Sequence, residues 1–357
     1  MKAEALLSDP GFQLNLLLWM TRAQPPEAYL VRPIFREQGF SLLYIENPLP
    51  LPEETAQKAA SSGMAVSVNP EPDVLLRRER DNTALCIEAK GRAFSSNSST
   101  ARQARGHLLA CGPAFAETLK PLTSSLLCYL VPNAETDYMG QCLSELSREL
   151  SNAGFKPGDH CVHGLHMDGS AVVYSWDSEF RVYAGYDSDS AIVMRNLQDG
   201  TDPSPLFLVF SDEDYPDPER QELNRKAFQN QVYAALLCQI QQTAAGEIYS
   251  RTIRDLLLNT TDGIFQYIGR DRQLRMCRLV RENIFKRILS YWKERIPDLV
   301  SLDSDSLIVR FADSARREQF LDWLEDYKRT AFACDKPPDE EPLPLLEMMN
   351  RNDTTDT

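Results

Sequence analysis

The sequence of 357 residues has no long hydrophobic run and no closely spaced pair of cysteines. The longest apolar run near its start, residues 16–20, is far shorter than the roughly 20 residues that span a membrane. Its eight cysteines include no C-x-x-C pair, unlike the cysteines of a disulfide framework or a cysteine zinc site. We therefore expect a cytoplasmic, unexported protein in a reducing compartment, with no membrane partner.

An overall basic excess is also missing, because the formal net charge is −14. The acidity is concentrated in residues 134–219, which hold 17 acidic and 4 basic side chains, and in residues 336–357, with 6 acidic and 2 basic. Residues 1–133 are balanced, with 13 of each sign, and residues 220–335 are slightly basic. Because the acidity is local, the net charge does not exclude nucleic-acid binding by the other segments.

The composition, 43% apolar and 25% charged, indicates a folded chain whose length suits two or three domains. We predict a core over residues 1–133, an acidic α+β segment over 134–218, and a mostly helical domain over 219–335. The acidic, proline-bearing stretch 211–218 is the best internal boundary. Residues 336–357, rich in Pro, Asp and Thr, indicate a flexible tail.

Apolar periodicity predicts alternating helices and strands, hence an α/β fold with a sheet flanked by helices and a middle segment rich in strands. The expected helices are residues 12–22, 27–38, 53–61, 101–119, 138–153, 219–243, 249–258, 273–295 and 314–329. The expected extended segments are residues 41–46, 65–68, 74–79, 84–90, 125–131, 170–176, 180–186, 191–195, 206–210 and 307–311.

The most informative pattern is Pro72-Asp73, fourteen further residues, and then Glu88-Ala89-Lys90. A two-residue turn between positions 80 and 83 would make the two segments a hairpin in which Asp73 pairs with Lys90. Since strand side chains alternate between faces, Asp73, Glu88 and Lys90 would share one face. The sequence therefore predicts two carboxylates and an ammonium group at one end of a hairpin.

Such a cluster suits metal-assisted phosphodiester hydrolysis, in which two carboxylates hold Mg²⁺ or Mn²⁺ and a lysine orients water or neutralises phosphate charge. The pattern resembles the PD-(D/E)XK nuclease superfamily, with its restriction-endonuclease-like fold. The resemblance covers roughly residues 27–133, where the expected helix, three strands, helix and strand follow the order of the superfamily core.

The resemblance implies roles for individual residues. Asp73, Glu88, Lys90 and Gln103 are the expected catalytic residues, and Asp73, Glu88 and Glu27 are the expected metal ligands. Glu27 is assigned because members often carry a metal-reaching glutamate on the first helix, and Glu37 is the alternative. Many members place Gln-x-x-x-Tyr on the helix after the lysine, whereas here His107 follows Gln103 at that spacing.

The function implied is a Mg²⁺-dependent or Mn²⁺-dependent endonuclease that acts on nucleic acid, with DNA as the expected substrate. A role in bacterial genome or phage defence, and a protein partner or a second copy of the chain, are further expectations. The alternative is a non-catalytic subunit that uses a degenerate nuclease fold to bind nucleic acid or protein. A third alternative is a purely structural interaction protein. A nuclease needs Asp73, Glu88 and Lys90 for cation binding and cleavage, whereas the non-catalytic subunit would tolerate alanine at all three positions.

Three of the four histidines, His160, His163 and His166, lie within seven residues beside Cys161. A transition-metal site is one interpretation of this cluster. The nearby glycines favour a loop or strand, in which the histidines would alternate between faces and serve as packed or exposed side chains.

The predicted helix at residues 273–295 and the three residues before it hold nine basic and three acidic side chains. Its apolar stripe comprises Cys277, Val280, Ile284, Ile288 and Tyr291. One interpretation is a basic band that contacts phosphates without sequence preference. The other is a salt-bridge partner for the acidic middle segment.

Overall fold

The computed structural model describes residues 2–23, 30–113, 115, 119–201, 206–208, 218–244 and 246–333. The chain divides into two compact units, which are Met1–Leu206 with Tyr267–Gly269, and Phe207–Gln266 with Arg270–Thr357. In the part of the chain that is described, no helix is both long and apolar enough to cross a membrane.

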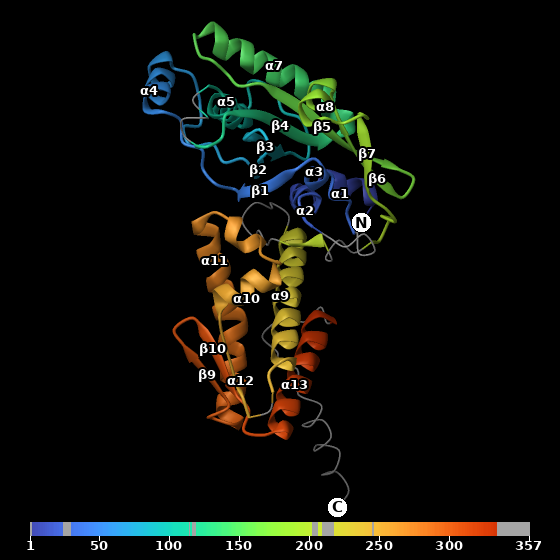
Figure 1. Ribbon diagram of the computed structural model, residues 1–357, viewed down its shortest axis with the longest axis vertical. Helices are drawn as coiled ribbons and strands as arrows, with labels where there is room; N and C mark the ends of the chain where they lie inside the picture. Colours follow the sequence, from blue (N-terminus) through green and yellow to red (C-terminus); the bar gives the residue numbers. More distant parts are fainter. Residues whose placement is uncertain are drawn as a thin grey trace, which may run out of the picture. The chain divides into compact units, whose positions relative to one another are not determined.

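One seven-stranded mixed sheet forms the centre of the first unit, and its strands lie side by side in sequence order (Figure 1). The strands are β1 (Phe40–Ile45), β2 (Val74–Arg78), β3 (Thr83–Ala89), β4 (Ser124–Pro132), β5 (His160–Asp168), β6 (Ala171–Trp176) and β7 (Ser190–Met194). Strands β3, β4 and β5 are parallel, and the other neighbours are antiparallel. The boundary predicted after residue 133 therefore falls between two paired strands of one sheet.

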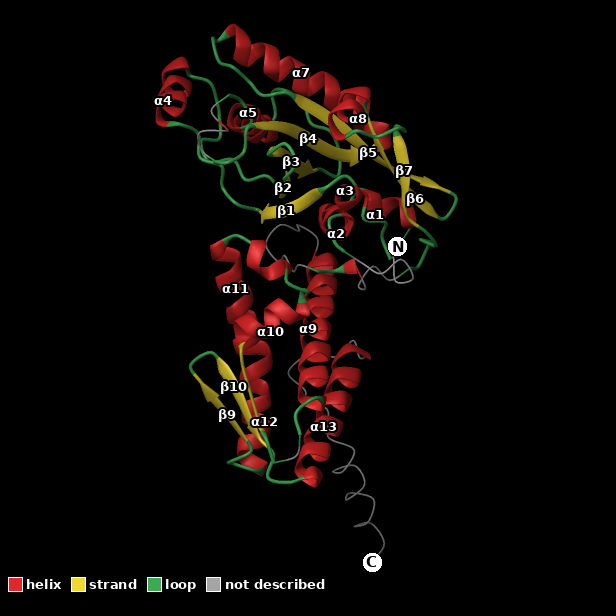
Figure 2. Cartoon of the chain, in the orientation of Figure 1, coloured by secondary structure: helices red, strands yellow, loops and turns green. Residues whose placement is uncertain are grey.

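Helices cover both faces of this sheet, so the predicted α/β class with a helix-flanked sheet is confirmed (Figure 2). The helices are α1 (Ala3–Leu7), α2 (Pro10–Met20), α3 (Ile34–Glu37), α4 (Glu53–Ser62), α5 (Ser99–Ala110), α7 (Thr136–Asn152) and α8 (Ser178–Ala184). Leu108 of α5 and Leu143 of α7 join Tyr129 of β4 in one buried cluster. On the opposite face, Phe180 of α8 packs on His163 of β5, with ring centroids 4.2 Å apart.

The strand predicted at residues 180–186 is wrong, because this segment forms helix α8. Asp177 caps the helix by accepting a hydrogen bond from the Phe180 backbone N–H at 2.8 Å, and Gly185 ends it at φ 81°. A half-buried strand would bury Phe180, Val182 and Ala184 together. The helix buries Phe180 and Ala184, four residues apart, and leaves Val182 79% exposed.

Other boundaries differ from the predictions in the first unit. The helix predicted at 27–38 is confined, within the described residues, to α3, which begins after Pro33. Residues 65–68 form no strand, and the Ser67 N–H donates to the Arg102 carbonyl of α5 at 3.0 Å. Helix α5 ends at Ala110 rather than at residue 119.

The second unit is mostly helical and carries a small antiparallel sheet in the order β8-β10-β9. Its elements are α9 (Pro218–Gln241), β8 (Ile248–Thr252), α10 (Ile253–Thr260), η4 (Ile264–Tyr267), α11 (Arg270–Val280), a π-helical turn (Arg281–Phe285), α12 (Lys286–Arg295), β9 (Val300–Asp303), β10 (Ser306–Arg310) and α13 (Ser314–Ala333). The helix predicted at 249–258 is wrong in its first part, because β8 pairs with β10 there.

Some of the predicted segments lie partly or wholly outside the described residues. Residues 206–208 form no strand, and the rest of the strand predicted at 206–210 lies outside the described residues. The stretch 211–217 and the tail after residue 333 also lie outside them.

Gly91 directly follows Lys90, and a Cβ atom there would lie 2.3 Å from the backbone oxygen of Ser8. We predict that Gly91→Ala lowers the free energy of unfolding by about 1–3 kcal/mol, because backbone has to move to admit the methyl group. Gly140→Ala is the matched control, since its Cβ would contact only Val162 Cγ2 at 3.9 Å within helix α7. It should leave stability unchanged or raise it by up to about 1 kcal/mol in urea unfolding. Equal losses in both variants would contradict the close approach.

Candidate active site

Strands β2 and β3 form the hairpin that brings Asp73 beside Glu88. Pairing runs from Val74 with Ile87 to Arg78 with Thr83, so the connection at residues 79–82 has four residues. The predicted two-residue turn is wrong, and with it the pairing of Asp73 with Lys90. Because the observed register differs by two residues, an even number, the predicted faces are retained. Continued by one residue, this register puts Asp73 opposite Glu88.

Asp73 and Glu88 are held by backbone hydrogen bonds across the hairpin. Asp73 Oδ2 accepts from the Ala89 N–H at 2.6 Å, and Glu88 Oε2 accepts from the Asp73 N–H at 3.3 Å. Glu88 is 1% exposed, whereas Asp73 is half-buried. One carboxylate is therefore enclosed by protein, and the other lies nearer to solvent.

Lys90 and Gln103 complete the group around the Glu88 carboxylate. Lys90 Nζ lies 2.6 Å from Glu88 Oε1, and Gln103 Nε2 donates to the same oxygen at 3.1 Å. The Lys90 Nζ and the Gln103 Oε1 are 3.5 Å apart. The Lys90 side chain is 26% exposed, so it links the buried carboxylate to solvent. The structure thus brings together all four residues predicted as catalytic.

His107 and Tyr129 form a buried layer behind these groups. His107 Nδ1 lies 3.1 Å from the Tyr129 hydroxyl oxygen, and its Nε2 lies 3.9 Å from Glu88 Oε2. Burial, together with the charge of Lys90, lowers the pKa of His107 to about 3, so its ring is neutral at pH 7. Tyr129 was not among the predicted site residues. It reaches the site because it is the partner of Glu88 in the parallel pairing of β3 with β4.

Burial raises the pKa of Glu88 above its usual range, and the charge of Lys90 with the hydrogen bonds from Asp73 and Gln103 opposes this shift. Removing a carboxylate from water disfavours its ionised form, and positive charge nearby restores it. The Glu88 carboxylate is therefore placed where additional positive charge would be favourable.

The third predicted metal ligand, Glu27, lies outside the described residues. The alternative, Glu37 of α3, forms an ion pair with Arg32 at 2.8 Å. Among the predicted ligands in the described part of the chain, Asp73 and Glu88 are therefore the pair that could hold a cation together. Their donor atoms are carboxylate oxygens, the hard ligands that suit Mg²⁺ or Mn²⁺.

Gln13 of α2 is a supporting residue that sequence reasoning missed. It is fully buried, and its Nε2 donates to the carbonyl oxygens of Leu7 at 2.6 Å and Lys90 at 3.2 Å. These bonds tie α2 to the end of β3, next to the Lys90 side chain. The available signal was the pair of amide side chains, Gln13 and Asn15, inside the mostly apolar stretch of residues 12–20.

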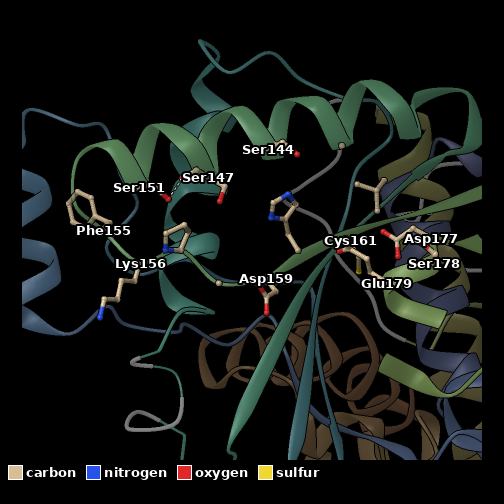
Figure 3. Close-up of a pocket in the computed structure, with 15 residues that line it drawn as sticks. Ser144, Ser147, Ser151, Phe155, Lys156, Asp159, Cys161, Asp177, Ser178 and Glu179 are labelled. Atoms are coloured by element: carbon tan, nitrogen blue, oxygen red, sulfur yellow. Dashed lines mark hydrogen bonds between the residues drawn. The ribbon is translucent and has the colours of Figure 1, made fainter. Parts of the chain in front are cut away.

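A separate polar groove of about 730 Å³ lies between α7, the loop before β5 and the start of α8 (Figure 3). Three serines of α7 line one wall, and Asp177, Ser178 and Glu179 line the opposite end. The four predicted catalytic residues are not part of this lining. The groove is therefore separate from the candidate active site, although both belong to the first unit.

The three clustered histidines lie on β5, consistent with the predicted loop or strand, and alternate between its faces. His163 is fully buried, whereas His160 and His166 are half-buried. Burial lowers the pKa of His163 to about 3, so its ring is neutral. The three side chains therefore do not converge on one metal ion.

The predicted basic helix consists of α11, the π-helical turn and α12. Its apolar stripe is buried from Val280 to Tyr291. Arg272 is also buried, at 6% exposure, which removes it from the expected phosphate-contacting surface. Arg278 is exposed, and Arg281 pairs with Asp305 of the same unit at 2.9 Å. Fewer of its basic side chains are therefore available to contact phosphates than the sequence predicted.

No family model, curated protein or solved structure matches this chain. The geometry of the Asp73, Glu88, Lys90 and Gln103 cluster itself indicates its chemistry. Two carboxylates, an ammonium group and an amide lie at the end of a parallel-paired strand, with the lysine reaching solvent. This arrangement can hold a divalent cation beside a positively charged side chain.

We predict that Glu88→Gln stabilises the cation-free protein at pH 8. A carboxyl group whose pKa is raised on folding favours folding when protonated, and this contribution is lost as the pH rises through the folded pKa. The amide avoids the buried charge, so the variant should unfold at higher temperature than wild type in EDTA. The difference should shrink as the pH is lowered, because Glu88 then becomes protonated.

Glu79→Gln, an exposed change in the loop of the same hairpin, is the control and should show no such trend. Thermal unfolding of the three proteins between pH 4.5 and pH 8 provides the measurement. A Glu88→Gln variant that is less stable than wild type across this range would contradict the assigned direction of the pKa shift.

Proposed function

We propose that this protein is a metal-dependent nuclease of the PD-(D/E)XK type that hydrolyses phosphodiester bonds in DNA. The observation that carries the proposal is the convergence of Lys90 Nζ on Glu88 Oε1 at 2.6 Å, with Asp73 bonded across the hairpin to the same strand. The motif resemblance alone extends the proposal to a cytoplasmic role in genome or phage defence.

The order of elements around the site supports this proposal. A helix, three antiparallel strands, a second helix and a strand parallel to the third occur here as α3, β1–β3, α5 and β4, with the additional helix α4 between β1 and β2. Asp73 directly precedes the second strand, Glu88 lies on the third, and Gln103 comes from the helix between the parallel strands. This is the arrangement that the motif resemblance leads one to expect.

Each residue has a distinct role in the proposed reaction. Asp73 and Glu88 would hold Mg²⁺ or Mn²⁺, which when bound supplies Lewis-acid polarisation of a phosphoryl oxygen and a more acidic water. Lys90 neutralises charge that develops on the phosphate or orients the attacking water. Gln103, which contacts both Glu88 and Lys90, keeps these two side chains in position.

The near-complete burial of Glu88 favours a second candidate, a non-catalytic subunit that binds nucleic acid or protein through this fold. In that case, the Glu88–Lys90 pair would serve only to neutralise a buried charge. The two candidates differ in whether cleavage exists and whether it depends on these side chains.

We predict that Glu88→Gln and Lys90→Met each lower cleavage by at least about 100-fold, because each removes a charge that acts on the cation or the phosphate. Asp73→Asn should likewise weaken Mn²⁺ binding measured by calorimetry. The assay is the purified protein with Mg²⁺ or Mn²⁺ against single- and double-stranded DNA and RNA.

Glu79→Gln, at the opposite end of the hairpin, is the matched control and should cleave like wild type. Wild-type turnover in the Glu88 or Lys90 variant would remove the site from the mechanism. Binding to nucleic acid with no cleavage under any of these conditions would instead favour the non-catalytic subunit.

The second unit provides a candidate nucleic-acid surface on α11. Arg275 and Arg278 lie on this helix, half-buried and exposed respectively. If both contact phosphates, log affinity falls with log salt by about 0.7–0.9 per contact. Arg275→Ala/Arg278→Ala should therefore reduce the slope by up to about twice that amount, measured in EDTA at four salt concentrations.

Arg251→Ala/Arg310→Ala removes two exposed arginines from β8 and β10 and serves as a control of equal charge. It should leave the slope close to the wild-type value. Equal slopes for the α11 variant and wild type would exclude α11 from the nucleic-acid surface.

A further inference from the structure

Two thiols and an imidazole converge on the face of the sheet opposite the candidate active site. Cys128 of β4 and Cys161 of β5 are direct partners in parallel pairing, and His163 follows Cys161 on the same face. One ligand atom of each residue lies within 4.8 Å of the other two. Cys128, Cys161 and His163 are 0%, 2% and 0% exposed. We call these three residues the thiol–imidazole cluster.

The spacing within the thiol–imidazole cluster matches tetrahedral coordination. Cys161 Sγ and His163 Nε2 are 3.5 Å apart. Zinc–sulfur bonds of about 2.3 Å and zinc–nitrogen bonds of about 2.0–2.1 Å at a tetrahedral angle separate sulfur and nitrogen by about 3.5–3.6 Å. The two ligand atoms are therefore already at the separation that one metal ion would require.

The other ring nitrogen of His163 lies in hydrogen-bonding distance of a tyrosine hydroxyl, as is common for metal-binding histidines. Its Nδ1 lies 2.7 Å from the Tyr174 hydroxyl oxygen. Histidines that bind metal through one nitrogen commonly hydrogen-bond through the other, which fixes the ring orientation. The Phe180 ring packs against the imidazole at 4.2 Å and restricts its movement. Nε2 is thereby directed toward Cys161.

We propose that Cys128, Cys161 and His163 bind one Zn²⁺ ion that joins β4 to β5, with a neutral water molecule in the fourth position. Binding replaces the two thiol protons, which leave to solvent, while neutral His163 supplies the Nε2 lone pair. Two thiolates balance the charge of the ion, so the filled site is electrically neutral. That neutrality makes burial of the metal acceptable in the interior, where an uncompensated charge would be strongly unfavourable.

The groove in Figure 3 provides a route from solvent to the thiol–imidazole cluster. Cys161 belongs to its lining, next to Asp177 and Glu179 at the start of α8. Carboxylates near the mouth of a site attract cations. The groove therefore explains how an ion could reach a cluster whose residues are almost completely buried.

The test is metal content after expression with Zn²⁺ or Co²⁺ and purification under reducing conditions without chelator. Wild type should carry about one zinc per chain, and the cobalt form should show thiolate-to-cobalt charge-transfer absorption. Cys128→Ser and Cys161→Ser should each lower the metal content at least 10-fold. Tyr174→Phe, which keeps all three ligands, should weaken zinc affinity by about 10-fold or more in competition with a chromophoric chelator.

Cys142→Ser, which changes a buried cysteine of α7, is the matched control and should keep the zinc. Glu88→Gln should also keep it, which separates this site from the proposed nuclease site. Wild-type protein with neither zinc nor the cobalt absorption would overturn the proposal, whether or not the serine variants fold. Equal loss of zinc in Cys142→Ser would also overturn it.

Discussion

The burial of one carboxylate, Glu88, is the constraint on which the candidate active site depends. At 1% exposure the group cannot be solvated by water, so the protein must supply its hydrogen bonds and positive charge. The positive charge comes from Lys90, just after β3. Hydrogen bonds come from the Gln103 amide of α5 and from the Asp73 backbone N–H, just before β2. Three separate elements therefore meet at one charge, and their meeting defines the site.

The two faces of the sheet carry different chemistry because of strand alternation. On the face covered by α5 and α7, the Asp73 and Glu88 carboxylates, the Gln103 amide and the Lys90 ammonium come together in front of His107 and Tyr129, and the carboxylates suit a hard cation. On the face covered by α8, the polar groups are thiols, an imidazole and a phenol, which suit a softer metal. One sheet can thus hold two kinds of site without their ligands mixing.

Local patterns and long-range pairing contributed differently to the predictions. The hairpin and the shared face of Asp73 and Glu88 follow from alternation within nearby strands, and they hold although the turn is longer than predicted. Helix α8 was missed because a short segment with apolar residues at alternate positions fits either a strand or a helix. The Asp177 cap and Gly185 decide in favour of the helix.

By itself, the sequence determined that the chain forms an α/β fold and that Glu88 and Lys90 share one face of a strand near Asp73. Strand periodicity and sequence proximity are sufficient for that inference. Only the tertiary structure decided that Tyr129 lies opposite Glu88 and that Cys128 lies opposite Cys161. Parallel strands are joined by long crossovers rather than tight turns, so no local signal sets their register, and packing of the whole sheet determines it.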